Sequence, residues 1–72
     1  MSQESEKVQL IKLHVNKLVD YLVREEKFSY EDAMVIVLGS KTYQLLVKSD
    51  WYLNQSCLYV LDDFKKEMEN NE

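Results

Sequence analysis

The sequence predicts an all-α fold: a small four-helix domain with a long amphipathic N-terminal helix, paired with a second copy as a helical dimer. Three observations support this prediction. Apolar residues recur at helical spacing near both ends of the chain, serines stand where helices would begin, and the 72 residues include no proline and one glycine. No linker is evident. Residues 1–72 are therefore expected to form one domain, with frayed ends at 1–5 and 70–72.

The longest helix is expected from about Glu4 to Glu26. Its apolar residues follow 3-4-3-4 spacing and so share one stripe of the helix; they are Val8, Ile11, Val15, Leu18 and Leu22. Leu10, Val19 and Val23 widen this stripe. At 1.5 Å per residue the helix would be roughly 30–35 Å long, which is more apolar length than the rest of a small domain can easily cover. The stripe is therefore the expected self-association face.

The stretch from Phe28 to Gly39 is expected to form a second, central helix. Ser29 and Asp32 fit a variant of the capping box, in which each side chain accepts from the other residue's backbone amide. Gly39 would end the helix in the left-handed conformation. The run AMVIVL is apolar on every side, which is typical of a helix contacted from several directions. A buried strand is the alternative, because VIV is β-branched, but the caps favour a helix.

Two shorter helices are expected after the glycine. Ser40 would begin one that runs to about Val47, and Ser56 would begin the last. Apolar residues of the last helix share one face at 4-3-4 spacing; they are Cys57, Leu61, Phe64 and Met68. The segment 51–53 lies between these helices and is interpreted as a connection.

Trp51 and Tyr52 in this connection are candidate anchors for a partner protein. Tryptophan and tyrosine are enriched at binding hot spots, and side chains in a connection are less certain to be buried than those on a helical stripe. The alternative is that Trp51 plugs the hinge into the core. The sequence leaves both interpretations open.

Composition excludes several classes of function. The formal net charge is −4 at pH 7, and an acidic chain repels phosphate backbones at long range, so nucleic acid is a disfavoured partner. A single cysteine permits neither a disulfide within the chain nor a thiolate metal cluster. The lack of a signal peptide or a long apolar segment favours a cytoplasmic protein that does not enter a membrane.

The sequence contains no recognisable catalytic motif. It has no glycine-rich phosphate loop, no nucleophile elbow and no paired-histidine zinc motif. We therefore expect no enzyme activity, no cofactor, no metal and no small-molecule substrate. His14 is interpreted as a structural or boundary residue, because partners for catalysis or metal binding are not evident. Cys57 lies on an apolar stripe and is interpreted as a buried, inert thiol.

A DNA-binding regulator is the alternative function. Residues 30–48 are expected to form helix, glycine, helix, an order that resembles a helix-turn-helix motif. Polar residues of the second helix would contact bases or phosphates; they are Lys41, Thr42, Gln44 and Lys48. Val35 stands where such motifs usually hold alanine, and Ser40 where an apolar residue is common. Two lysines on an acidic domain also make a weak electrostatic footprint.

Three short segments between residues 29 and 67 match the pattern of a known family. They are SYEDA at 29–33, SKTYQLL at 40–46 and SCLYV at 56–60, and the last helix ends near an acid, Glu67. This pattern resembles a family of small bacterial helical proteins of unknown function. Some members are encoded beside a toxin-like enzyme and are suspected antitoxins. The resemblance implies a toxin-binding role and no catalytic residue.

Together these observations predict a small bacterial protein–protein interaction module. We expect a homodimer that forms through the stripe on the first helix. A second protein is expected as a further partner, bound or neutralised in the manner of an antitoxin, with Trp51 and Tyr52 as secondary anchors.

Overall fold

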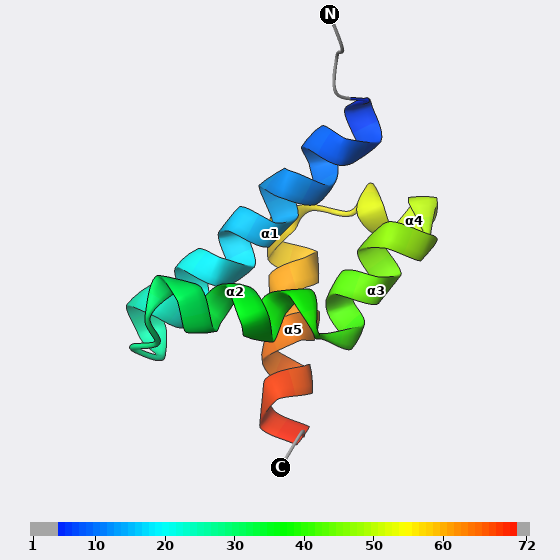
Figure 1. Ribbon diagram of the computed structural model, residues 1–72. Coiled ribbons are helices and arrows are strands. Elements are labelled where there is room, and N and C mark those ends of the chain that lie inside the picture. Colours follow the sequence, from blue (N-terminus) through cyan, green and yellow to red (C-terminus); the bar gives the residue numbers. More distant parts are fainter. Residues whose placement is uncertain (1–4, 71–72) are drawn as a thin grey trace, which may run out of the picture.

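A computed structural model describes residues 5–70, which form five helices (Figure 1). In chain order they are α1 (Glu6–Glu25), α2 (Tyr30–Leu38), α3 (Lys41–Lys48), α4 (Asp50–Leu53) and α5 (Cys57–Asn70). The described residues contain no strand, so the predicted all-α class is confirmed. The helix missing from the prediction is α4, a single turn in the supposed connection. Residues 1–4 and 71–72, expected to fray, lie outside the described part; Ser5 and Asn70, also expected to fray, cap α1 and end α5.

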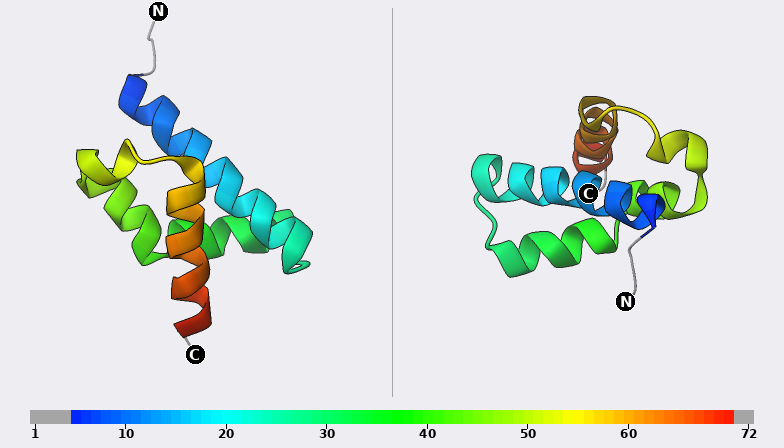
Figure 2. Two further views of the ribbon diagram at one scale, coloured as in Figure 1. Left: turned by 180° about the vertical axis from the view of Figure 1, so that it is seen from behind. Right: turned by 90° about the horizontal axis from the view of Figure 1, so that it is seen from above.

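The long helix α1 forms the middle layer of the fold. Seen from above, α2 lies along one side of α1 and α5 lies on the other, while α3 and α4 close one end (Figure 2). Side chains from all five helices meet in one core; they are Val15, Leu18, Val19, Leu22, Ala33, Val37, Leu46, Tyr52, Leu53, Val60 and Phe64. Both α2 and α5 pack against α1, which explains why its apolar stripe is so broad.

The prediction that α2 would be the central helix is wrong. Ala33 and Val37 face α1 and are fully buried, whereas Val35 is 72 % exposed and Leu38 is 46 % exposed. An all-round apolar sequence requires neighbours on several sides for full burial. Within the chain, α2 packs mainly along one face of α1, and its outer face stays open to solvent.

Each described helix begins after a serine that caps it. The hydroxyl oxygen accepts a hydrogen bond from the amide three residues further on, at 3.1–3.2 Å. The five caps are Ser5, Ser29, Ser40, Ser49 and Ser56. Serine at this position satisfies an amide that has no partner inside the helix, and replacing it with alanine typically costs about 0.5–2 kcal/mol. The predicted caps of α2, α3 and α5 are confirmed.

The expected left-handed residue lies elsewhere than predicted. Gly39 has φ −92° and ψ 2°, so it does not use the conformation that only glycine adopts readily. Lys27, in the turn between α1 and α2, has φ 66° and is the single non-glycine residue with positive φ in the described range. This reversal lets the amide of Phe28 donate to the Leu22 carbonyl at 3.1 Å.

Replacing Lys27 with glycine is expected to stabilise the fold by about 0.5–1 kcal/mol. A left-handed conformation costs a side-chain-bearing residue roughly 1–2 kcal/mol, and part of this gain is lost to the greater freedom of glycine in the unfolded chain. The matched control is Lys27→Ala, which removes the same side chain, including its hydrogen bond to the Arg24 carbonyl, and keeps the strain. Urea denaturation should give Lys27→Gly a higher free energy of unfolding than wild type, and Lys27→Ala an equal or lower one. Equal free energies of unfolding for the two variants would contradict a strained left-handed conformation at Lys27.

Candidate protein-interaction site

Only the N-terminal end of the predicted self-association face is open to a partner. Val8 is 40 % exposed and Ile11 is half-buried, but the exposed fraction then falls to 8 % at Val15, 0 % at Leu18 and 1 % at Leu22. The last three residues belong to the chain's own core. Their assignment to a self-association face is therefore corrected, because α2 and α5 cover α1 from both sides.

The exposed end of this stripe opens into a groove between α1, α2 and α3, here called the front groove. Its cavity is about 320 Å³, and it is lined by Ile11, Lys12, Val15, Asn16, Met34, Leu38 and Tyr43. The apolar surface extends along two helices, because Val8 lies one turn before Ile11 and Val47 lies one turn after Tyr43. Both valines and Leu38 are exposed by more than a third.

The two predicted aromatic anchors have opposite environments. Trp51 is 65 % exposed, so the alternative in which it plugs the hinge into the core is wrong. Tyr52 fills that place instead; it is 5 % exposed, and its hydroxyl donates to the Asp63 carboxylate at 2.9 Å. Burial, and then this hydrogen bond, raise the pKa of Tyr52 well above its usual range. Tyr52 is therefore no anchor, whereas Trp51, edge to face with Tyr59 at 6.2 Å, is accessible.

The residues proposed for DNA contact do not all face solvent. Lys41, Gln44 and Lys48 are exposed, but Thr42 is 3 % exposed. The Glu67 carboxylate accepts from the amides of Lys41 and Thr42 at 2.9 and 3.1 Å and from the Thr42 hydroxyl at 2.8 Å. A recognition helix contacts bases with its N-terminal residues. Here that end of α3 is bound by a carboxylate, which corrects the assignment of Thr42.

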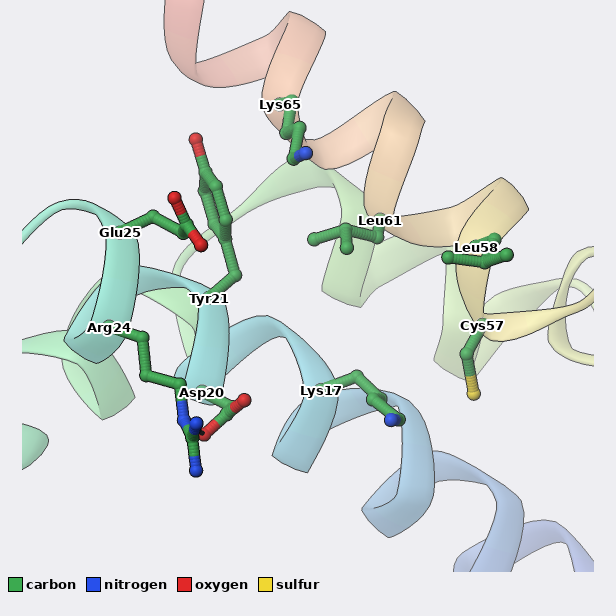
Figure 3. Close-up of a pocket in the computed structure, with 9 residues that line it drawn as sticks. All are labelled: Lys17, Asp20, Tyr21, Arg24, Glu25, Cys57, Leu58, Leu61 and Lys65. Carbon is green, nitrogen blue, oxygen red and sulfur yellow. Dashed lines mark hydrogen bonds and ion pairs between the residues drawn. The ribbon is translucent and has the colours of Figure 1, made fainter.

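A second groove lies between α1 and α5 on the opposite side of α1 from α2, and is called the back groove (Figure 3). Its cavity is about 270 Å³ and is lined by Lys17, Asp20, Tyr21, Arg24, Glu25, Cys57, Leu58, Leu61 and Lys65. Leu58 and Leu61 lie next to each other on the α5 side, and the Tyr21 ring stands on the α1 side. Leu58 is 78 % exposed.

Charged side chains surround this apolar floor. Arg24 pairs with Asp20 at 2.8 Å, and both point away from α5. The ammonium of Lys65 lies 5.1 Å from the centre of the Tyr21 ring, within the range of a cation–π contact. Desolvation by burial, and then the hydrogen bond from its hydroxyl to Glu26, raise the pKa of Tyr21, so it stays protonated at neutral pH.

His14 and Cys57 behave differently from each other. His14 is 2 % exposed, and its Nε2 donates to the Leu53 carbonyl oxygen at 2.9 Å; this supports the structural role. Cys57 is half-buried and directs its sulfur into the back groove, so its interpretation as a buried thiol is wrong. In the described part of the chain, no three histidine, cysteine or acidic side chains are grouped closely enough to hold a metal ion.

Comparisons with protein-family models, curated proteins and solved structures find no match to this chain. The resemblance to small bacterial helical proteins therefore stays a prediction. None of the described helices combines the length and the apolar character needed to cross a membrane. The two grooves and Trp51 are among the surfaces of the described residues that a binding partner could use.

Proposed function

We propose that this protein is a protein–protein interaction module that associates with itself through the front groove and its apolar rim. The observation that carries this proposal is the run of exposed apolar side chains around that groove, from Val8 on α1 to Leu38 on α2 and Val47 on α3. Lys12 is the only charged residue in the lining. Cores of homodimer interfaces are similarly apolar and poor in charge.

The size of the surface is consistent with a second copy as the partner. A stable interface buries about 800 Å² on each side, roughly a seventh of the 5335 Å² that this chain exposes. The groove alone is too small for this, so the rim must take part. Three helices contribute to the rim, and two copies related by a two-fold axis would each bring the same rim to the other's groove.

Substitutions that introduce a charge at the rim of the front groove test this proposal. Val8→Asp and Leu38→Asp place a carboxylate on side chains that are already 40 % and 46 % exposed, so each monomer should still fold. Sedimentation equilibrium from micromolar to millimolar protein should show wild type approaching twice the monomer mass and both variants remaining monomeric. Leu18→Asp would be uninformative, because Leu18 is fully buried and a charge there would unfold the chain.

The control is Leu58→Asp, which adds the same charge to a more exposed leucine on α5, outside the front groove. It should dimerise like wild type, and far-UV circular dichroism should be unchanged in all three variants. A wild-type chain that stays monomeric throughout this range would refute self-association. Dimers of unchanged strength in both front-groove variants would instead refute the assigned face.

The proposed function also includes the binding or neutralising of a second protein, in the manner of an antitoxin. Trp51 supports the binding of a second protein, because it is exposed on α4 and tryptophan is enriched at the hot spots of protein interfaces. The DNA-binding alternative receives no such support, since the carboxylate of Glu67 occupies the start of the helix that would enter the groove of DNA.

A further inference from the structure

The back groove is lined by three cationic and two acidic side chains. Within residues 5–70, Lys17 makes no ion pair, and Lys65 contacts the Tyr21 ring in place of a carboxylate. Arg24 is paired with Asp20, which leaves Glu25 as the other acid of the lining. The two lysines lie at opposite ends of the groove in Figure 3. The lining therefore has one more positive than negative charge, in a chain whose net charge is −4. Glu26 and Glu69 lie next to the Lys65 end, in the lining of the adjoining pocket.

The surface between the two lysines is apolar and exposed to solvent. Leu58 is the most exposed of the large hydrophobic side chains in the described residues, at 78 %, and Leu61 follows one turn later on the same face of α5. Covering an exposed leucine fully is worth about 1.5–3 kcal/mol. An occupant with apolar groups in the middle and negative charge at both ends would therefore match the groove in shape and in charge.

We propose that the back groove is the docking site for an acidic amphipathic helix of a partner protein. The apolar side chains of this partner helix cover Leu58 and Leu61, and its carboxylates pair with Lys17 and Lys65. This proposal rests on the proposed interaction function and adds the chemistry of the second partner. It uses a different surface from the front groove, so each of the two sites can fail without the other.

The dimensions of the groove favour a helix over a small molecule. From Lys17 to Arg24 the groove follows α1 for about two turns, or roughly 10 Å. A helix laid in a groove presents its anchors at i, i+3 or i+4 and i+7 over the same distance. The cavity of about 270 Å³ lies just below the range of roughly 300–1,000 Å³ that is usual for small-molecule pockets.

Charge complementarity acts here at short range. The net negative charge of the chain repels an acidic partner from afar, but this field is screened beyond about 8 Å at physiological ionic strength. At contact, the charges that line the groove determine the electrostatic energy of binding, and the ammonium groups of Lys17 and Lys65 attract a carboxylate there. The site therefore selects a partner by the sign of the charge beside its apolar anchors.

The test uses two fluorescein-labelled peptides of about 15 residues, long enough to form a helix when bound. Both carry leucines at helical spacing, and their flanking residues are glutamates in one peptide and lysines in the other. Fluorescence anisotropy with the full chain should give the acidic peptide at least about tenfold tighter binding than the basic one. The double variant Lys17→Glu, Lys65→Glu should reverse this preference, an outcome that mere loss of folding cannot produce.

Leu58→Ser should weaken the acidic peptide by about tenfold, and Val35→Ser, at a similarly exposed valine on α2, should leave its affinity unchanged. Leu38→Asp, which is designed to split the dimer, should bind the acidic peptide as tightly as wild type does. A failure of self-association can therefore be distinguished from a failure of the back-groove site. Equal binding of both peptides, no binding of either, or an unreversed preference in the charge-swapped variant would overturn the proposal. If Leu58→Ser lowered the molar mass from that of a dimer to that of a monomer, the proposal would also be overturned, because the back groove would then bind a second copy of the chain.

Discussion

Replacing Phe64 with alanine should destabilise the fold by about 3–5 kcal/mol, the cost of removing a large side chain from a packed core. Phe64 is fully buried between α5 and α1, and the Tyr21 ring meets it edge to face at a centroid distance of 6.4 Å. A chain of 72 residues is expected to have only roughly 4–11 kcal/mol of total stability. The substitution should therefore remove a large fraction of the total free energy of unfolding, and at the lower end of that range the variant would be unfolded at room temperature.

Urea denaturation followed by circular dichroism at the helical band measures this loss. The control is Phe28→Ala, the same substitution at a side chain that is 40 % exposed in the turn after α1, and its cost should be below about 1.5 kcal/mol. Phe64→Leu keeps most of the volume and should fold with a smaller loss. Similar costs for Phe64→Ala and Phe28→Ala would show that α5 does not pack on α1 as described.

Replacing Glu67 with alanine should cost about 2–3 kcal/mol, because one carboxylate satisfies three donors at the start of α3. Without it, the Thr42 hydroxyl and amide lose their partner in a part-buried place, and hydrogen bonds to charged groups are worth roughly 1.5–3 kcal/mol. For a domain of this size, such a loss lowers the melting temperature by about 10 °C or more. Thermal unfolding by circular dichroism measures it.

Two further variants identify the cause. Glu67→Gln keeps one oxygen acceptor but loses the charge that favours the start of a helix, so its cost should be about 1 kcal/mol. Glu69→Ala removes a carboxylate from an exposed position on the same helix, and should change stability by less than about 0.5 kcal/mol. If Glu67→Ala costs no more than Glu69→Ala, the contact between α5 and α3 contributes nothing to the fold.

Local signals in the sequence were sufficient to predict most helices. Ser29, Ser40 and Ser56 cap the helices they were expected to begin, because a serine cap depends only on the next three residues. The same signal exists at Ser49, which is followed by an acid in the first turn of α4. It was missed because one helical turn is too short for an apolar period to show.

The candidate sites depend on contacts between distant parts of the chain, and these were not predictable. Spacing placed Val8 and Leu18 on one stripe, but only the packing of α2 and α5 decides that one is exposed and the other buried. The hydrogen bond from Thr42 to Glu67 joins residues 25 positions apart. Periodicity reports which face is apolar, and tertiary packing determines what covers it.

The middle position of α1 has a consequence for the order in which the chain is made. About 40 residues separate Leu22 from Phe64, so translation at 5–20 residues per second takes roughly 2–8 s to supply the side chain that covers α1 on the α5 side. During this interval α2 is already available to pair with α1. The nascent chain therefore passes through a half-covered stage, in which the surface reserved for α5 is open to a chaperone or to another copy of α1.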